Sequence, residues 1–252
     1  MIELKQIRKD YGERTVIKNQ SLSIKDKEFF VLIGPSGSGK TTLLKLINRL
    51  IDPTEGDVLL NGKSVMDYPL RKLRLNTGYV LQQIALFPNL TVAENIELVP
   101  IMKKWPKQIR KEQTTQLLSK VGLDPKIYAH RYPHELSGGE QQRVGIVRAI
   151  IGKPEILLMD EPFSALDPIS RRQLQDLIKT LHHELGLTIV FVTHNMEEAA
   201  YLGDRLCIMN HGEIIQTETP DEIKSRPEND FVARFFSRGC AVSYTHLTLP
   251  TN

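Results

Sequence analysis

The chain has little cysteine and no long apolar run. Cysteine occurs only twice, as Cys207 and Cys240, so a disulfide framework is excluded and a reducing compartment is expected. No apolar stretch approaches the roughly 20 residues that a membrane-spanning helix needs. No signal peptide precedes the first predicted strand. We therefore expect a chain that is soluble by itself and that reaches a membrane only through a partner.

An excess of charge of one sign is also lacking. The 33 Lys and Arg residues stand against 30 Asp and Glu residues, which leaves a formal net charge of +3. Such a balance argues against a dominant nucleic-acid surface. No internal repeat and no low-complexity linker divides the 252 residues, a length that suits one large domain or two small ones.

A glycine-rich loop lies between a predicted strand at 29–33 and a predicted helix at 41–47. It fits the pattern G-x-x-x-x-G-K-[ST] with Gly34, Pro35, Ser36, Gly37, Ser38, Gly39, Lys40 and Thr41, and Thr42 follows. The backbone N–H groups of such a loop and the positive helix N-terminus hold phosphate oxygens. We predict that Lys40 reaches the β- and γ-phosphates of ATP and that the Thr41 hydroxyl ligates Mg²⁺.

A second apolar strand, at 156–159, ends in two acids, Asp160 and Glu161. A carboxylate at the end of a buried strand beside the phosphate loop can hold Mg²⁺ directly or through water, which is the role predicted for Asp160. Glu161 faces elsewhere, so it can orient or deprotonate the attacking water. The alternative is an exposed acidic turn, which the unbroken continuation at 162–167 disfavours.

The string Leu136-Ser137-Gly138-Gly139-Glu140 resembles the LSGGQ signature of the ATP-binding-cassette (ABC) ATPases, with Glu140 where Gln is commoner. Together the strings resemble that family over residues 1–236. The resemblance implies that the signature opens a helix and contacts the γ-phosphate of ATP held by a second subunit. A serine hydroxyl and open N–H groups at a helix start suit an anion. An ordinary helix cap would explain Ser137 but not Gly138 and Gly139.

Further positions match elements of the family. Tyr11 lies where an aromatic ring stacks on adenine, and the alternative is a plain surface tyrosine. Gln82 matches the glutamine that links Mg²⁺ and the attacking water to a partner, although Gln83 beside it leaves the register open. Residues 164–167 resemble the D-loop at the dimer interface. His194 follows a third apolar strand and resembles the switch histidine that bonds the γ-phosphate.

The alternation of strands and helices predicts an α/β fold. The resemblance makes it a P-loop NTPase (RecA-like) core with an N-terminal antiparallel β-subdomain, since 2–4 and 21–24 alternate as strands do. A helical subdomain, about 88–150, is inserted before the second acidic strand. His182 and His183 occur on a polar helix without metal-ligand partners, and we interpret both as solvated surface residues.

Finer strings resemble the ATPases of bacterial osmoprotectant importers, which serve glycine betaine, carnitine, choline or proline betaine. These strings lie at 47–51, 78–84, 99–105 and 165–171. The resemblance implies an ATPase with ATP and Mg²⁺ as cofactors. It also implies a head-to-tail dimer beneath integral-membrane permease subunits, peripheral on the cytoplasmic side of the cell membrane. An extracytoplasmic substrate-binding protein is an indirect partner, and nucleic acid is not one.

Three alternatives remain beside this interpretation. Importers of other solutes, such as ergothioneine or bile salts, use similar ATPases. Soluble ABC ATPases of translation or DNA repair usually carry two fused cassettes or a long coiled-coil insertion, which this chain lacks. A scaffold that binds nucleotide without hydrolysis conflicts with the presence of Glu161 and His194.

The end of the chain departs from the family. Val242–Thr251 resembles the translation of a transposon sequencing adapter. We therefore expect residues 237–252 to be an artefactual tail, starting between Ser237 and Val242, that contributes nothing to the ATP site, and the natural protein to continue beyond it. The alternative is a short natural tail. A C-terminal pair of CBS domains is one continuation that the resemblance suggests.

Overall fold

A computed structural model of the protein describes residues 1–164 and 166–240, the last four of these by their backbone alone. The strands are β1 (Ile2–Tyr11), β2 (Arg14–Ile24), β3 (Phe29–Ile33), β4 (Glu55–Leu60), β5 (Lys63–Ser64), β6 (Thr77–Val80), β7 (Ile156–Asp160), β8 (Thr188–Thr193), β9 (Arg205–Asn210) and β10 (Glu213–Glu218). The predicted strands at 29–33 and 156–159 are confirmed. The predicted tail lies largely outside the described residues.

The helices include the one predicted at 41–47 and those expected within about 88–150. They are α1 (Lys40–Ile47), α2 (Leu70–Leu75), α3 (Val92–Met102), α4 (Lys107–Lys120), α5 (Pro125–Tyr128), α6 (Gly138–Ile150), α7 (Pro168–Leu185), α8 (Met196–Leu202), α9 (Pro220–Ser225) and α10 (Asp230–Cys240), with short 3-10 turns at Val65–Asp67 and Pro133–Glu135. Within the described ranges, no helix combines the length and apolar character that crossing a bilayer requires.

The central sheet has the strand order β10-β9-β3-β8-β7-β6. The five strands from β9 to β6 run parallel, and only β10 is antiparallel to its neighbour. Val80 pairs with Met159, Asp160 with Val192 and Ile33 with Thr193. The carboxyl ends of four strands therefore meet at one edge, which is where open α/β sheets bind their ligands.

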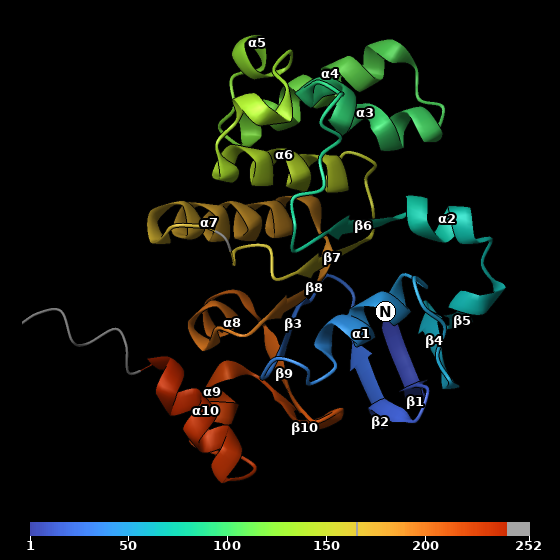
Figure 1. Ribbon diagram of the computed structural model, residues 1–252, viewed down its shortest axis with the longest axis vertical. Coiled ribbons are helices and arrows are strands. Elements are labelled where there is room, and N and C mark those ends of the chain that lie inside the picture. Colours follow the sequence, from blue (N-terminus) through green and yellow to red (C-terminus); the bar gives the residue numbers. More distant parts are fainter. Residues whose placement is uncertain (165, 241–252) are drawn as a thin grey trace, which may run out of the picture.

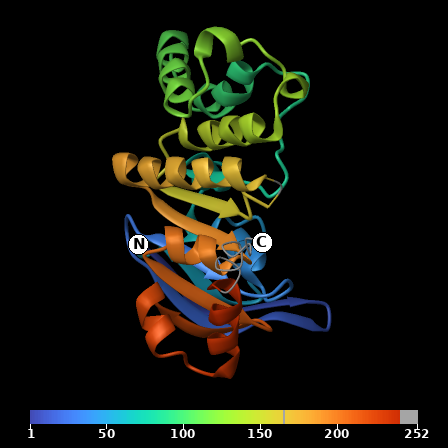
Figure 2. The ribbon, with the colours of Figure 1, turned by 90° about the vertical axis from the view of Figure 1, so that its left-hand side faces the viewer.

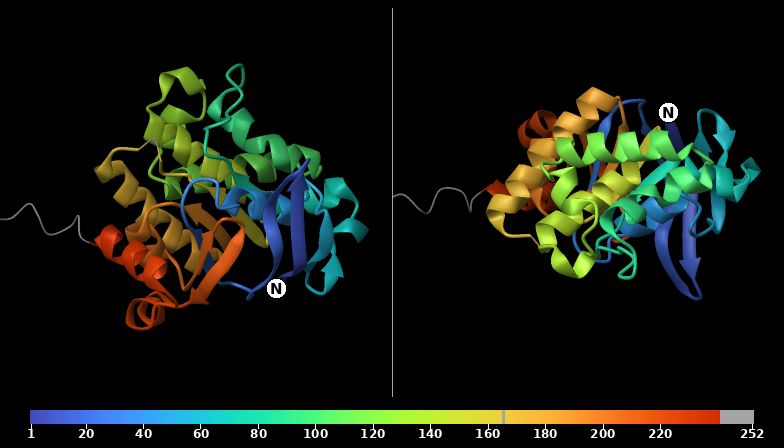
Figure 3. Two further views of the ribbon diagram at one scale, coloured as in Figure 1. Left: turned by 60° about the horizontal axis from the view of Figure 1, so that its bottom comes forward. Right: turned by 90° about the horizontal axis from the view of Figure 1, so that it is seen from above.

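A second sheet, of order β2-β1-β4-β5, is antiparallel throughout. Ile2 pairs with Ile24 and Leu4 with Leu22, which confirms the predicted antiparallel start of the chain. Figure 3 shows this hairpin beside α1, and it shows α10 and α2 on opposite sides of the molecule.

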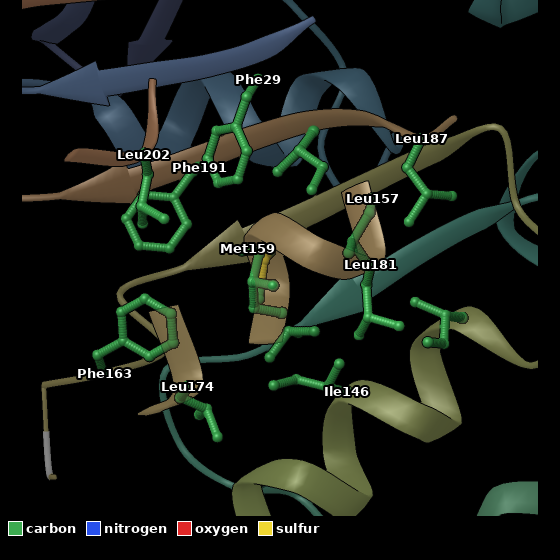
Figure 4. Packing of buried hydrophobic residues seen from close by; sticks show 14 of the residues in the cluster. Phe29, Ile146, Leu157, Met159, Phe163, Leu174, Leu181, Leu187, Phe191 and Leu202 are labelled. Atoms are coloured by element: carbon green, nitrogen blue, oxygen red, sulfur yellow. The ribbon is translucent and has the colours of Figure 1, made fainter. Parts of the chain in front are cut away.

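Alternate residues of the central strands face two different hydrophobic clusters. Phe29, Val31 and Ile33 pack with α6, α7 and α8, whereas Phe30 and Leu32 pack with α1 and the antiparallel sheet. Such alternation is what a sheet covered on both faces requires. Figure 4 shows the first cluster, where side chains of α7 lie between the strands and α6. Helices α1 and α6 thus cover opposite faces of the sheet.

The chain between β6 and β7 forms helices α3 to α6, as predicted for about 88–150. Figures 1 and 2 show α3, α4 and α5 stacked at one end of an elongated molecule, with α6 and α7 between them and the sheet. Helix α3 begins with a complete capping box, in which Thr91 and Glu94 satisfy each other's backbone N–H groups. The segment therefore carries its own start signal.

The prediction for His182 was wrong. His182 is buried on α7, where its Nε2 lies 3.1 Å from the Lys27 carbonyl oxygen and its ring meets Phe29 edge-on at 5.4 Å between centroids. It lies one turn after Ile178, on the apolar stripe of the helix. Burial lowers the pKa of His182. His183 is exposed, as predicted.

Candidate functional site

Two glycines of the 34–41 loop occupy positions that exclude side chains. A Cβ at Gly34 would lie 2.1 Å from the backbone oxygen of Met209. Gly39 caps α1 with a φ of 104°, a left-handed conformation that favours glycine, and a Cβ there would meet Val16 and Ile17 of β2. The loop is therefore held between β9 and β2. By contrast, a Cβ at Gly37 would meet nothing within 4 Å, so the loop is open on that side.

Lys40 closes the loop from within. Its ammonium donates to the carbonyl oxygens of Gly34 and Pro35 at 2.8 Å each, and Ser38 Oγ lies at 3.5 Å. The residue is buried. Burial lowers the pKa of Lys40, and the charges of Glu161 and Asp160 oppose that shift. A buried ammonium with neutral carbonyl partners is suited to bind an anion that enters the loop.

Asp160 and Thr41 meet across the sheet edge. The Thr41 hydroxyl, in the first turn of α1, donates to Asp160 Oδ1 at 2.8 Å. Asp160 ends β7 and is buried, and this burial is the main cause that raises its pKa. A hydroxyl oxygen and a carboxylate oxygen are ligands of the kind that Mg²⁺ prefers. Two of the three predicted metal ligands are thus brought together from distant parts of the sequence, and the third, Gln82, follows the end of β6.

Glu161 turns away from Asp160, as predicted. Its φ of 44° is left-handed, uncommon for a residue other than glycine. Its backbone N–H donates to the Val192 carbonyl. The carboxylate lies 3.0 Å from His194 Nδ1. The exposed fractions of the two side chains are 19% for Glu161 and 59% for His194, so the pair is accessible at the end of β8.

Gln82 and Tyr11 lie at the margins of this edge. Gln82 follows the end of β6 by two residues and is exposed, and so is Gln83. Tyr11 ends β1 and is half exposed, with Lys9 Nζ 5.1 Å from its ring centroid. Gln82 and Tyr11 are both exposed, whereas Asp160 is buried.

The signature string forms the start of α6. Ser137 is the N-cap, and its hydroxyl accepts from the Glu140 backbone N–H at 3.3 Å. Glu140 Oε2 accepts from the backbone N–H and the hydroxyl of Ser137, while Oε1 accepts from the Tyr128 hydroxyl at 2.6 Å. The hydrogen bond from Tyr128 is the largest cause that lowers the pKa of Glu140, and the bonds from Ser137 lower it further. The departure from the usual Gln thus has a structural role.

The predicted site residues fall into two groups. The 34–42 loop, Asp160, Glu161 and His194 converge on one edge of the sheet. Ser137, Gly138 and Gly139 begin α6, on the face opposite α1, and Ser137 and Gly138 are exposed. One chain therefore does not bring its own signature to its own phosphate loop.

Two residues beside Glu161 and His194 were not predicted. Arg171 and Glu198 form a pair at 3.6 Å between α7 and α8. The only sequence signal is spacing: each lies four residues beyond a predicted element, Asp167 or His194. Charged residues also stand directly beside these positions, at Arg172 and Glu197, so the sequence does not single out this pair.

The chain belongs to the ABC transporter family, whose model matches residues 17–164. It is 49% identical to "Glycine betaine/carnitine/choline transport ATP-binding protein OpuCA" of Bacillus subtilis (strain 168) over 94% of this chain and 63% of that protein. It is 44% identical to "Glycine betaine uptake system ATP-binding protein YehX" of Escherichia coli (strain K12) over 94% of this chain and 77% of the relative. The chain spans about three fifths of the length of the first of these.

The fold is also similar to a solved cassette. The dimeric structure of a post-hydrolysis state of MJ0796, bound to ADP and Pi, has a TM-score of 0.78 and 38% identity, covering 87% of this chain and 98% of that one. The predicted P-loop NTPase fold class is thereby confirmed.

Proposed function

We propose that this chain is the ATP-hydrolysing subunit of an ABC importer for quaternary-amine osmoprotectants. The observation that carries the hydrolytic part is the convergence at one sheet edge of Lys40, the Thr41–Asp160 pair and the Glu161–His194 pair. These groups supply phosphate binding, metal ligation and water activation within one site. Family membership and the ADP and Pi bound by MJ0796 support nucleotide binding.

The 34–42 loop would hold the phosphates of ATP. Lys40 would exchange its bonds to loop carbonyls for phosphate oxygens, and the N–H groups at the start of α1 add a positive dipole end. Tyr11 would stack on adenine. Thr41 and Asp160 would hold Mg²⁺ from the protein side, with Gln82 nearby. Bound Mg²⁺ neutralises charge on the phosphate oxygens.

Glu161 would act as the general base. Its carboxylate is partly accessible and already accepts a close contact from His194 Nδ1. That contact orients the carboxylate, and in the doubly protonated form of the ring, Nε2 of His194 would donate to a γ-phosphate oxygen. Asp160 is held by its hydrogen bond with the Thr41 hydroxyl, on the metal side of the site, and would not take the same role.

A head-to-tail dimer would complete each site. Ser137 and Gly138 are exposed, on the far face of the sheet from Lys40. The signature N–H groups and hydroxyl of one chain would then meet the γ-phosphate held by the other. The dimeric state of MJ0796 supports this arrangement. ATP would favour the closed dimer because it contacts both chains only in that state.

Permease subunits would hold the dimer at the cytoplasmic side of the membrane. Large apolar side chains are exposed on the segment that leaves β6, at Leu81 and Phe87, and at the end of α3, at Ile101 and Met102. Exposed apolar residues of this size suit a protein partner. An extracytoplasmic binding protein would deliver the solute.

We also propose that residues 1–236 form one ABC ATPase domain, into which the helical subdomain at about 88–150 is inserted.

The solute assignment is tested in cells. Deleting the gene should reduce accumulation of glycine betaine or carnitine at high salt, and restoring the gene should recover it. A gene carrying Glu161→Gln serves as the control, because it should not restore uptake. Normal uptake of these solutes together with loss of another would reassign the importer to that solute.

A further inference from the structure

A small cavity of about 50 Å³ lies directly beside the Glu161–His194 pair. Its lining comes from three segments: the turn after β7, the first turns of α7, and the junction of β8 with α8. The residues that line it are Glu161, Ser164, Arg171, Thr193, His194, Asn195 and Glu198. Two charged side chains, Arg171 and Glu198, therefore line the same cavity as the proposed base.

Glu198 is fixed to the segment that carries His194. Its carboxylate is buried, and Oε2 accepts from the Thr193 hydroxyl at 2.7 Å. The same hydroxyl accepts from the Asn195 backbone N–H at 3.0 Å. The residues on both sides of His194 are thus tied to one carboxylate. The Asn195 side chain caps α8 by accepting from two backbone N–H groups, which holds the first turn of that helix.

Arg171 is fixed to the segment that carries Glu161. Its Nη2 donates to the Leu166 carbonyl at 3.1 Å. Leu166 N–H in turn donates to the Phe163 carbonyl, and Ser164 N–H to the Glu161 carbonyl. Two successive turns therefore connect the Arg171 guanidinium to the backbone of Glu161.

The ion pair joins these two segments, since Arg171 Nε lies 3.6 Å from Glu198 Oε1. The exposed fraction of the Glu198 side chain is 9%, and that of Arg171 is 31%. Burial raises the pKa of Glu198, whereas the Thr193 hydrogen bond, Arg171 and His194 favour its charged form and Glu161 opposes it. In such a buried setting, removing one partner leaves the other charge without compensation.

We propose that Arg171 and Glu198 are positioning residues, which hold the segments of Glu161 and His194 in register so that the carboxylate and the imidazole meet. The proposal rests on the function of Glu161 proposed above. Neither residue would contact ATP. Their loss would let the two segments shift relative to each other, and a shift of about 1 Å at a reacting group can lower a rate about 100-fold.

The test compares steady-state phosphate release by the purified chain as ATP is varied. Arg171→Ala and Glu198→Gln should each lower kcat about 10- to 100-fold, while KM for ATP and the ATP dissociation constant stay within about twofold of the parent values. Arg171→Lys keeps the charge but loses the planar fork that bonds Leu166, so its kcat should be intermediate. The double variant should be no slower than the slower single variant, because both changes break one connection.

Arg172→Ala is the matched control. Arg172 is the next residue of α7, and it forms a pair of the same length, 3.6 Å, with Asp176 on the exposed surface. Its guanidinium also lies 3.8 Å from the centroid of the Tyr201 ring on α8. Its removal should leave kcat unchanged, because among the described residues it contacts neither the Glu161 nor the His194 segment. Melting temperatures of all variants separate a shifted site from a loss of folded protein. Should Arg171→Ala fail to fold, Glu198→Gln and Arg171→Lys decide the question alone.

The positioning role is overturned if kcat of Glu198→Gln and Arg171→Lys equals that of the parent. It is also overturned if the effects of Arg171→Ala and Glu198→Gln multiply in the double variant, or if KM rises as much as kcat falls. Absence of turnover in the unaltered protein would instead overturn the proposed function, and the positioning role with it.

Discussion

The phosphate loop and the signature segment are both glycine-containing starts of helices, yet their surroundings differ. The loop at 34–41 lies between β2 and β9, and Lys40 and Thr41 are bonded to groups of their own chain. At the signature, 137–139, Glu140 accepts hydrogen bonds from Ser137 and from the Tyr128 hydroxyl, but Ser137 and Gly138 are exposed. The bonds that hold the phosphate loop come from its own chain. The signature residues, in contrast, leave their polar groups exposed.

This difference separates binding from turnover. A chain that builds its own phosphate loop can bind nucleotide as a monomer. Under the proposed function, a signature on the other face of the sheet would need a second copy of the chain to complete the site. Substitutions in the two regions should therefore have different effects on binding, dimer formation and hydrolysis.

The largest effect is expected at Glu161. Glu161→Gln should lower turnover about 10²–10⁴-fold, the usual effect of removing a general base, and should leave ATP binding intact. Phosphate release and ATP-dependent dimer formation are the measurements. Glu155→Gln is the control, because Glu155 precedes β7 at the opposite end of the strand and is exposed. Normal hydrolysis by Glu161→Gln would show that the base is another group.

Ser137→Arg tests the signature directly. Monomeric ATP binding should be unchanged, while turnover falls about 10²-fold or more, because the added side chain displaces the helix start from the anion. Size-exclusion chromatography with ATP and phosphate release measure the two effects. Ser119→Arg, at an exposed serine of α4, should behave like the parent protein. Dimerisation and hydrolysis by Ser137→Arg would contradict a shared site.

Lys40→Ala should weaken ATP binding itself. Loss of a charge-assisted bond to phosphate corresponds to about 10- to 100-fold in affinity. Titration with a fluorescent ATP analogue measures the dissociation constant, and Lys72→Ala, at an exposed lysine of α2, provides the comparison. An unchanged dissociation constant for Lys40→Ala would place the phosphates elsewhere.

The smallest effect is expected at Glu140, which completes the capping box at the start of α6. Glu140→Ala removes the acceptor for Ser137 and Tyr128, which should lower the free energy of unfolding by about 1 kcal/mol. Glu140→Gln can keep a capping box, so its melting temperature should stay closer to that of the parent. Thermal unfolding of both variants measures the difference. Equal melting temperatures for the parent and Glu140→Ala would show that these bonds do not stabilise the helix start.

Much of the fold could be predicted because its signals are local. The apolar run at 29–33, the glycine loop before a helix and the signature string that opens a helix each occupy a few consecutive residues, and each forms the element that was predicted. The prediction that His182 is a surface residue was wrong, because its burial depends on contacts with Phe29 and the Lys27 carbonyl. These residues are distant from α7 in the sequence and adjacent to it only in the fold.

The sequence by itself determined the motifs typical of ABC ATPases and the strands and helices that carry them. It also determined which types of side chain could bind phosphate, bind a metal ion or activate water. Only the tertiary structure decided which of these groups meet. Thr41 bonds Asp160, and Arg171 pairs with Glu198, because parallel strands bring their carboxyl ends to one edge and helices on either side close around it. Pairings of this kind depend on strand order and register, which single short motifs do not encode.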